Sequence, residues 1–450
     1  MRRWITLASC LFAGNCILAP LVCAGPTSRL DALASEGERL ARQPLAATDG
    51  WAAFSTGTTG GSVAAPENVY VVTTRKELAD ALKNAGSLPK IILVYGTIDA
   101  NVDDNNMPLA CADYVTQGYT LEAYLAAFHP EVWGRTKVPS GPLEDARKAS
   151  QGNQQKRVRI TVPANTTLVG LGNDATIVGA NIYLKNVDNV IIRNITFRDA
   201  FDCFPQWDPT DGSTGNWNSQ YDNIWLTGAT HVWVDHCAFD DGDHPDSEQP
   251  EYFDRVYTPH DGELDITNAS DLVTVSWNRF VDHDKVMLVG SSDKAPADVG
   301  KLRVTLHHNL YANVVQRGPR VRYGQVHIYN DFYVIGENDG YDYSWGVGVQ
   351  SHIYAENNFF EMGSVTPDQI IKRFSGTTIH VGETCVNGPA SAERIDVLAA
   401  YNATYNPDLA PDDSWVPLLV GEMHPTEAVP ALVWHKAGPF LSKTDPHVPR

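Results

Sequence analysis

Three aspartates could form a binding site for a hard divalent cation. Asp222 stands alone in the sequence, whereas Asp261 and Asp265 lie four residues apart with Gly262 between them. Carboxylate oxygens are the ligands that calcium prefers. On a straight strand the two later aspartates would lie about 13 Å apart, so sharing one ion requires a bend, which we expect Gly262 to permit. An acidic, solvated surface is the alternative that this pattern leaves open.

A basic segment follows the aspartates. Between Gly300 and Asn330 the chain has no acidic residue, but it has five cationic ones: Lys301, Arg303, Arg317, Arg320 and Arg322. Screening acts over about 8 Å, so such a segment can attract an anionic ligand although the chain is acidic as a whole. Pro319 cannot donate to a central strand ladder. We therefore expect a strand to start late or to break there, which would let Arg317 and Arg322 converge. An exposed edge with salt bridges is the alternative.

Two other polar patterns resemble metal sites. The segment 240–246 is rich in acid, and we expect a loop there, with calcium binding the less favoured interpretation. Histidines occur at 236, 260, 283, 307 and 308, which is suggestive of zinc. However, 236 and 308 recur at the same place in a sequence repeat described below. Stacking between repeats, or hydrogen bonding at turns, is therefore the favoured role for these histidines.

Length and composition limit the class of protein. The chain has 450 residues, of which 43% are hydrophobic and 10% aromatic, which excludes a disordered chain and allows one large domain or two ordinary ones. Its net charge of −20 argues against a general nucleic-acid binder. No segment after residue 24 approaches the roughly 20 apolar residues of a membrane span.

The first 24 residues have the pattern of a secretory signal peptide. Arg2 and Arg3 precede an apolar stretch at about 4–22, and small residues precede Gly25. A membrane anchor and a lipoprotein cleavage before Cys23 are less favoured. The pattern predicts a secreted, extracellular protein, and residence in a periplasm stays open. Four cysteines follow the peptide, at 111, 203, 237 and 385; they permit two disulfides without determining which cysteines pair.

A repeat from residue 158 onward indicates the fold. An apolar-x-apolar-x-polar-x-x-aromatic pattern begins at 190, 232, 273, 304, 326 and 353, with spacings of 42, 41, 31, 22 and 27 residues. Such short, alternating runs predict strands, and variable spacing predicts stacked units with loops on one side. The 22-residue step argues against a propeller, and the lack of helical crossovers excludes a doubly wound fold. A parallel β-helix fits best, and a β-sandwich is the alternative.

Polar residues recur two positions before the aromatic residue of this repeat, at Asn278, Asn309, Asp331 and Asn358. In a β-helix such side chains can form a ladder at one turn. Before the repeat we expect a helix or a surface segment at about 28–43 and a helix at about 75–84, with Thr74 and Glu77 forming a capping box. A buried strand is expected at 91–95 and a helical stretch at about 121–128. Residues 100–156 are predicted to be an insertion.

Taken together, these motifs resemble the pectate lyase family of parallel β-helix polysaccharide lyases. The resemblance covers roughly residues 50–360, and its order of elements is specific. The matching elements are Gly57-Thr58-Thr59-Gly60-Gly61, Trp233-Val234-Asp235-His236, Asp261-x-x-x-Asp265, His283-Asp284-Lys285 and Arg317-x-Pro-x-x-Arg322. It implies one right-handed parallel β-helix domain over 25–450 with short flanking helices and long loops. In that domain 100–156 would be an insertion and 361–450 a C-terminal extension packed on the solenoid.

The resemblance also implies roles for individual residues. Asp222, Asp261 and Asp265 match calcium ligands, Arg317 matches the proton-abstracting base, and Lys285 and Arg322 match positions that bind the uronate carboxylate. Trp233, Asp235 and His236 match structural positions. Because all three carboxylates are present, the expected substrate is the anionic polysaccharide polygalacturonate, cleaved by calcium-dependent β-elimination. A monomer without nucleic-acid or membrane partners is expected. Gln220, where some relatives have an acid, leaves the number of calcium ions open.

Two other functions compete with this interpretation. A β-helix polygalacturonase would use a carboxylate pair as acid and base without calcium, and a binding protein with this fold would need no catalytic cations. If Arg317 is the base, activity requires alkaline pH, because a guanidinium is otherwise always protonated. Endo or exo cleavage, tolerance of methyl esters and the role of 361–450 are not determined by the sequence.

Overall fold

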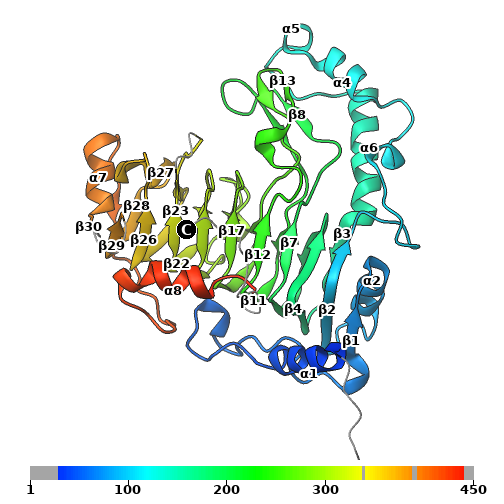
Figure 1. The fold of residues 1–450 in the computed structure, drawn as a ribbon. Helices are drawn as coiled ribbons and strands as arrows, with labels where there is room; N and C mark the ends of the chain where they lie inside the picture. Colours follow the sequence, from blue (N-terminus) through cyan, green and yellow to red (C-terminus); the bar gives the residue numbers. More distant parts are fainter. Residues whose placement is uncertain (1–28, 337–339, 388–392, 440–450) are drawn as a thin grey trace, which may run out of the picture.

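The computed structural model describes residues 29–336, 340–387 and 393–439, so the predicted signal peptide lies outside the described residues (Figure 1). The chain winds into a parallel β-helix whose successive turns stack along one axis. This confirms the predicted fold class. No helix within the described ranges is long and apolar enough to cross a membrane.

Three stacks of parallel strands form the walls of the β-helix. The first stack contains β3 (Arg159–Thr161), β5 (Asn181–Lys185), β10 (Ile224–Thr227), β15 (Leu264–Thr267), β18 (Leu288–Val289), β21 (Arg320–Val321), β24 (Trp345–Gly348) and β27 (Ile371–Phe374). The second contains β1 (Val69–Val72), β2 (Lys90–Asp99), β4 (Thr166–Val178), β6 (Asp188–Arg193), β11 (Thr230–Asp235), β16 (Asp271–Ser276), β19 (Val304–His307), β22 (Gln325–Tyr329), β25 (His352–Glu356), β28 (Thr378–Val381) and β31 (Ala410–Pro411).

The third stack continues from the far halves of β2 and β4. Its other members are β7 (Thr196–Arg198), β12 (Ala238–Asp240), β17 (Arg279–Val281), β20 (Leu310–Ala312), β23 (Phe332–Val334), β26 (Asn358–Glu361) and β29 (Thr384–Val386), on which β30 (Glu393–Arg394) pairs antiparallel. Two short hairpins project from the loops: β8 (Gln206–Asp208) with β9 (Asn216–Asn218), and β13 (Glu251–Tyr252) with β14 (Arg255–Val256).

The sequence repeat corresponds to the register of the strands. Its six starting residues are direct neighbours in the second stack: Val190, Val232, Val273, Val304, Val326 and Ile353. Its aromatic residues are neighbours in the third stack, with rings stacked face to face: Phe197, Phe239, Phe280, Tyr311, Tyr333 and Phe360. These residues are buried in one continuous core. The period therefore sets the stacking of the turns, because each residue packs on its own counterpart.

The predicted polar ladder lies at the corner between the second and third stacks. The side-chain oxygen of Asn309 accepts hydrogen bonds from the backbone N and Nδ2 of Asn278, and Asp331 Oδ1 accepts from Asn309 in the same way. Asn358 continues the ladder by accepting from the backbone N of Asp331. At the same corner, His236 and His308 stack on the two faces of Trp277. Stacking between turns is thus confirmed for these two histidines.

Helices cover the ends and sides of the β-helix (Figure 1). They are α1 (Arg29–Ala41), α2 (Arg75–Lys83), α3 (Cys111–Tyr114), α4 (Leu121–Phe128), α5 (Pro130–Trp133), α6 (Pro142–Val158), α7 (Val397–Thr404) and α8 (Val429–Lys436). The helices predicted at 28–43, 75–84 and 121–128 correspond to α1, α2 and α4, and the capping box at Thr74 is present. The strand predicted at 91–95 lies within β2. Short 3-10 turns complete the regular structure: η1 (Trp51–Ala53), η2 (Pro66–Asn68), η3 (Asp246–Glu248), η4 (Pro296–Asp298), η5 (Pro367–Gln369) and η6 (Thr426–Ala428).

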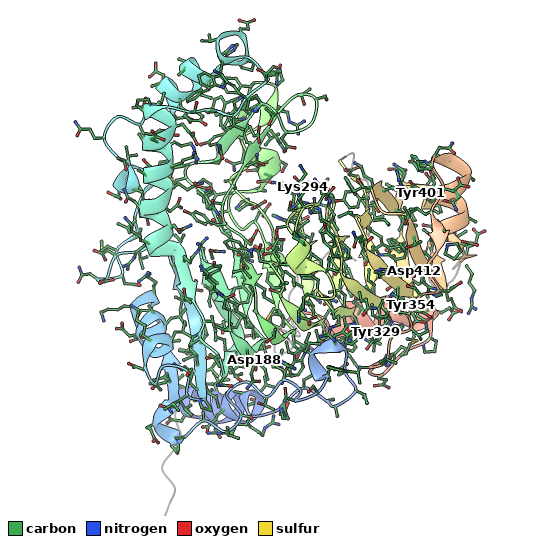
Figure 2. The ribbon with its side chains drawn as sticks, turned by 180° about the vertical axis from the view of Figure 1, so that it is seen from behind. Asp188, Lys294, Tyr329, Tyr354, Tyr401 and Asp412 are labelled. Carbon is green, nitrogen blue, oxygen red and sulfur yellow. A yellow bond between two sulfur atoms is a disulfide. The ribbon has the colours of Figure 1, made fainter. Side chains whose placement is uncertain are left out.

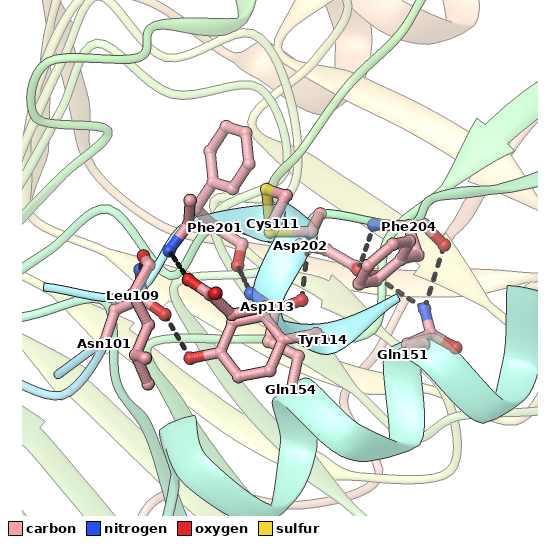
Figure 3. Close-up of a disulfide and its surroundings, with 12 residues drawn as sticks. Asn101, Leu109, Cys111, Asp113, Tyr114, Gln151, Gln154, Phe201, Asp202 and Phe204 are labelled. Carbon is pink, nitrogen blue, oxygen red and sulfur yellow. Dashed lines mark hydrogen bonds between the residues drawn. A yellow bond between two sulfur atoms is a disulfide. The ribbon is translucent and has the colours of Figure 1, made fainter. Parts of the chain in front are cut away.

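Residues 100–156 form a helical wall beside the loops that leave the third stack, and they add no named strand to the stacks. A disulfide joins Cys111 in α3 to Cys203 in the loop after β7 (Figure 3). Gln154 of α6 donates to the backbone oxygen of Phe201 in the same loop. Among the described cysteines, Cys237 and Cys385 are free and buried, so one disulfide forms where the count permitted two.

Candidate active site

The predicted site residues lie on the outward face of the first stack and in the loops that enter it. Leu264 and Ile266 of β15 point into the core, so Asp265 between them points outward. Asp265 occupies the register of Leu288 and Arg320, one and two turns further along. Lys285 forms isolated parallel bridges with Gly262 on one side and Gln316 on the other. The ladder thus brings segments far apart in sequence to one surface.

The carboxylates of Asp222 and Asp265 converge around Gly262. Oδ1 of Asp222 accepts a hydrogen bond of 2.9 Å from the backbone N of Gly262, and Oδ1 of Asp265 accepts one of 2.9 Å from the backbone N of Leu288. A Cβ on Gly262 would lie 2.9 Å from the first oxygen and 2.6 Å from the second. The glycine therefore leaves room for two carboxylates to meet.

This corrects the role expected for Gly262. Its φ lies outside the left-handed region, so its conformational freedom is not what the turn requires. The chain bends at Glu263 instead, before β15 begins at Leu264. Gly262 is required because it has no side chain, which leaves space for the carboxylates of Asp222 and Asp265, and not because its backbone adopts a conformation specific to glycine.

The electrostatics of the cluster fit a bound divalent cation. Burial, followed by repulsion from Asp265 and Asp261, raises the pKa of Asp222 well above its usual range. Burial and the nearby Asp261 likewise raise the pKa of Asp265 to about 7. These carboxylates repel one another and lose their hydration, which opposes ionisation. A hard cation with oxygen ligands would relieve both costs, so the donor set is chemically suited to calcium.

Lys285 and Arg317 face this cluster. Lys285 is 5% exposed, and its Nζ lies 3.6 Å from Oδ1 of Asp261. Arg317 has φ 63°, in the left-handed region that non-glycine residues seldom adopt. The strand after it begins only at Arg320, beyond Pro319, as the sequence predicted. The loop conformation, rather than a strand, directs Arg317 toward the aspartates.

The guanidinium of Arg317 is a cation surrounded by acids. Burial favours its neutral form, but Asp261 and then Tyr343 and Asp265 outweigh that effect and raise its pKa above the usual value. Within the described part of the chain, its buried Nε donates no hydrogen bond, and no carboxylate oxygen lies within 4.0 Å of the group. Within the described residues, Arg317 is therefore held near the acids without an ion pair to any of them.

Arg322 makes its polar contacts with groups outside the acidic cluster. Its Nε donates to Oδ1 of Asp293 at 2.5 Å and its Nη1 to the backbone oxygen of Gly290 at 2.8 Å. Arg322 directly follows β21, and its backbone N donates to Val289 as that of Arg320 donates to Met287, so both residues lie on the outward face of the first stack. The structure therefore places all six predicted residues on this face, with Arg322 already engaged by a local carboxylate.

Two residues without a predicted role lie on the same face. Arg320 stacks over the ring of Phe374 at 3.9 Å, and burial together with repulsion from Arg322 lowers its pKa. Lys372, in register with Gly346 and thus with Arg320, pairs with Asp342 at 2.6 Å. The basic segment had included Arg320, but nothing in the sequence marked Lys372. Aligning the strands of successive turns in the sequence would have placed Arg320 and Lys372 at the same outward position.

The residues expected to be structural lie elsewhere, on the second stack and its corner. Oδ2 of Asp235 pairs with Arg193 and with His236, each at 2.8 Å. Although burial opposes ionisation, His236 and Arg193 hold the pKa of Asp235 well below its usual range. Nε1 of Trp233 donates to Ser276. This network ties adjacent turns together and does not reach the outward face of the first stack.

Comparisons with known proteins agree on one family. A family model described as "Pectate lyase" matches residues 29–115 and 141–407. A pectate lyase of Bacillus subtilis (strain 168) is 48% identical over 404 residues, which cover 89% of this chain and 93% of that protein. The solved structure of a thermostable pectate lyase matches with a TM-score of 0.86 at 49% identity, over 89% of this chain and 99% of that one. A structure of a pectate lyase bound to a hexasaccharide matches with a TM-score of 0.85 at 47% identity over the same shares.

Proposed function

The chain belongs to the pectate lyase family and is a polysaccharide lyase acting on polygalacturonate, and we propose that it cleaves this substrate by calcium-dependent β-elimination. The observation that carries the proposal is the meeting of Asp222, Asp261 and Asp265 with Lys285 and Arg317 at one place on the β-helix. Polygalacturonate is an anion, and this site combines cations with an acidic cluster that needs a counter-ion. The sequence predicted no other surface that combines a cluster of carboxylates with a cluster of cations.

Asp222, Asp261 and Asp265 would hold the calcium ion. When bound, calcium would neutralise the acidic cluster and the uronate carboxylate, which stabilises negative charge developing beside that carboxylate. The chain itself keeps Asp222 and Asp265 in place through the backbone N–H groups of Gly262 and Leu288. These two hydrogen bonds would therefore help to position the carboxylates that hold the ion.

Arg317 would remove the proton from C5 of the uronate. The C5–H bond breaks, its electron pair forms the C4–C5 double bond, and the C4–O bond breaks with the leaving oxygen protonated from solvent. Arg317 can accept the proton only when its guanidinium is neutral. Asp261 and Asp265 oppose that state through their negative charge. Neutralising these acids, together with alkaline pH, favours a neutral Arg317.

Lys285 and Arg322 would bind the uronate carboxylate and stabilise the developing enolate-like charge. Lys285 is preorganised, because its ammonium is nearly buried and faces Asp261. Arg322 is held by Asp293 and Gly290, so only part of its guanidinium is available for the substrate. The two cations thus differ in readiness to bind an anion.

The test is incubation of the purified protein with polygalacturonate, with and without calcium, at pH 6 and pH 9. A lyase forms a 4,5-unsaturated product that absorbs in the ultraviolet, and we expect that absorbance only with calcium and mainly at pH 9. Reducing ends without ultraviolet absorbance, unaffected by chelator, would indicate a hydrolase. Binding without any product would indicate a non-catalytic protein. A rate maximum below pH 6 would exclude Arg317 as the base.

We also propose that residues 1–24 direct secretion and are removed, leaving a single monomeric domain over 25–450. The disulfide between Cys111 and Cys203 supports an oxidising compartment. Residues 361–439 support a single domain, because α8 packs against Phe332 and Phe359 of the third stack. Amino-terminal sequencing of protein from the culture medium, with its mass in solution, tests the cleavage, the localisation and the monomer together.

A further inference from the structure

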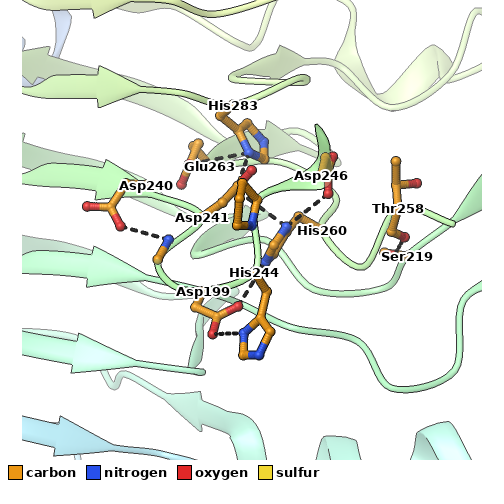
Figure 4. A network of polar contacts seen from close by, with 12 residues as sticks. Asp199, Ser219, Asp240, Asp241, His244, Asp246, Thr258, His260, Glu263 and His283 are labelled. Atoms are coloured by element: carbon orange, nitrogen blue, oxygen red, sulfur yellow. Dashed lines mark hydrogen bonds and ion pairs between the residues drawn. The ribbon is translucent and has the colours of Figure 1, made fainter. Parts of the chain in front are cut away.

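A second polar cluster contains Asp241, Glu263 and His283 (Figure 4), and His283 contacts the backbone of the proposed calcium ligand Asp261. Asp241 is 4%, His283 4% and Glu263 0% exposed, and ligand atoms from all three lie within 4.8 Å of one another. Nδ1 of His283 lies 2.6 Å from Oδ1 of Asp241 and 3.5 Å from Oε1 of Glu263. Two carboxylates therefore converge on one imidazole nitrogen in a buried space.

The other nitrogen of this imidazole has a fixed role. Nε2 of His283 lies 3.1 Å from the backbone oxygen of Asp261, which can only accept a hydrogen bond. Nε2 therefore carries a hydrogen. In a neutral ring Nδ1 then presents a lone pair to two carboxylates, which is repulsive; either a proton on Nδ1 or a metal ion between the groups removes that repulsion. A hydrogen bond from the ring to a backbone oxygen is also the contact that orients metal-binding histidines.

Two carboxylate oxygens in the cluster lack partners. Across the described ranges, Oδ2 of Asp241 and Oε1 of Glu263 are buried and accept no hydrogen bond. A proton on Nδ1 of His283 would serve Asp241 Oδ1 and leave both of these oxygens unpaired. Unpaired buried polar atoms are costly. A divalent ion could instead bind one oxygen of each carboxylate together with the nitrogen.

Surrounding residues hold the three side chains in place. Nδ2 of Asn223 donates to Oε2 of Glu263, leaving Oε1 directed at the histidine. Nδ1 of His260 lies 3.4 Å from Asp241, and that ring also contacts Asp246 at 3.1 Å and Asp199 at 3.0 Å. The cluster is therefore a positioned set of donors rather than an exposed acidic patch.

We propose that Asp241, Glu263 and His283 bind one divalent transition-metal ion, separate from the calcium site and structural in role. An imidazole nitrogen with two carboxylate oxygens suits zinc better than calcium, which takes six to eight oxygen ligands. The sequence favoured stacking between repeats or hydrogen bonding at turns for the histidines, and His283 does contact the ring of His260 and the backbone oxygen of Asp261. Its Nδ1 also contacts two carboxylates, which the sequence did not indicate.

The site would brace the calcium-binding loops from behind. His283 contacts the backbone of Asp261, and Asn223, which bonds Glu263, follows Asp222 directly. Fixing Glu263 and His283 would therefore fix the backbone that carries two proposed calcium ligands. We expect loss of the transition metal to lower the melting temperature and to weaken calcium binding without abolishing it.

The test uses zinc as the probe, with calcium in excess so that its own site is filled. Protein treated with a chelator selective for transition metals is titrated with Zn²⁺ by calorimetry, and metal content is measured after gel filtration. We expect one zinc ion per chain, and an electronic spectrum typical of mixed nitrogen and oxygen ligands when Co²⁺ replaces zinc. Absence of zinc binding to the wild-type protein would overturn the proposal without any variant.

Variants locate the site. Glu263→Gln keeps the shape and the hydrogen bond from Asn223, and we expect it to weaken zinc binding at least about 100-fold. Asp241→Asn serves the same purpose if Glu263→Gln does not fold. His244→Gln is the matched control, since His244 is half exposed and pairs only with Asp199. Unchanged zinc affinity in both ligand variants would contradict the proposal. Lyase activity with calcium alone is measured separately, so the two proposals can fail independently.

Discussion

The two corners of the third stack differ in construction. At the corner with the second stack, which we call the ladder edge, only two residues separate the strands, for example His308 and Asn309 between β19 and β20. At the corner with the first stack, the loop edge, the connections are longer and unequal, as between Asp240 and Leu264. At the ladder edge, a hydrogen bond from a backbone N to the side-chain oxygen on the next turn recurs from Cys237 to Asn358. The connections at the loop edge differ in length and in contacts from turn to turn.

This difference separates stability from chemistry. The ladder edge and the core behind it give each turn a fixed position, because residues of the same type, aromatic on aromatic, stack on one another. The loop edge supplies Asp222, Asp261, Lys285 and Arg317, none of which lies within a regular strand. A rigid repeat thus allows irregular loops to carry side chains to one place. In Figure 2, Tyr329 and Tyr354 of the second stack lie close together at one side of the β-helix, and Lys294, in the connection between β18 and β19, lies away from them.

The largest expected effect comes from the loop edge. Arg317→Lys keeps the positive charge but changes the proposed base, and we expect kcat on polygalacturonate to fall about 10²- to 10⁴-fold. The melting temperature should change little, because Arg317 has no fixed ion-pair partner in the described structure. Initial rates from ultraviolet absorbance measure the effect. Arg303→Lys, in the same basic segment but paired with Asp271, is the control and should retain activity.

The next largest effect belongs to the ladder edge. Asn309→Ala leaves the backbone N of Asn278 and the backbone oxygen of Val275 without these hydrogen bonds in the core, and removes one of the two bonds that Asp331 accepts from Asn309. Each such group costs about 1–3 kcal/mol, so we expect the free energy of unfolding to fall by at least about 3 kcal/mol. Equilibrium denaturation in urea measures it. If the folded variant also lost its calcium requirement, the assignment of stability to the ladder edge and of chemistry to the loop edge would be wrong.

A third prediction concerns pH and chelation at the loop edge. The folded-state pKa of Asp265 is raised to about 7, above that of an unfolded aspartate. Its contribution to stability is therefore present below about pH 4 and is lost as pH rises through about 7. In chelator we expect the melting temperature to fall by a few degrees between pH 5 and pH 8. Calcium should restore it mainly at pH 8, and a calcium effect equal at both pH values would contradict this.

The smallest effect is expected from Asp293→Asn, which frees Arg322 from its carboxylate partner. The partner is about half exposed, so its ion pair contributes at most about 1 kcal/mol. We expect KM for polygalacturonate to fall by no more than about fivefold, with kcat unchanged and the unfolding free energy lowered by at most about 1 kcal/mol. Steady-state kinetics across substrate concentrations check this. A large loss of kcat would show that Asp293 belongs to the catalytic machinery.

Much of the fold could be predicted because it repeats. The in-register valines from Val190 to Val326 and the ladder at Asn278 and Asn309 are visible as periodic residue types, and each packs on a copy of itself. Non-repeating features were less accessible. The pairing of Cys111 with Cys203 depends on how the helical wall meets the loop after β7, and no period records that contact.

The candidate site shows the same limit. The sequence indicated the acidic and basic residue types, but the reason for Gly262 differed from the one expected, because only the structure shows two carboxylates where its Cβ would lie. Lys372 enters the site surface through strand register alone. The cluster around His283 was likewise hidden, since its ligands come from separate loops.

The sequence by itself determined the repeating turn, the acidic balance and the residue types available for chemistry, because local periodicity and charge are properties of the chain. Only the tertiary structure decided which loops meet, how Arg322 and Lys285 differ in their partners, and which carboxylates share a buried space. The physical reason is that these contacts depend on the number of residues in each loop and on stacking between turns. Loop length and stacking between turns are properties of whole segments, so no single residue type reveals them.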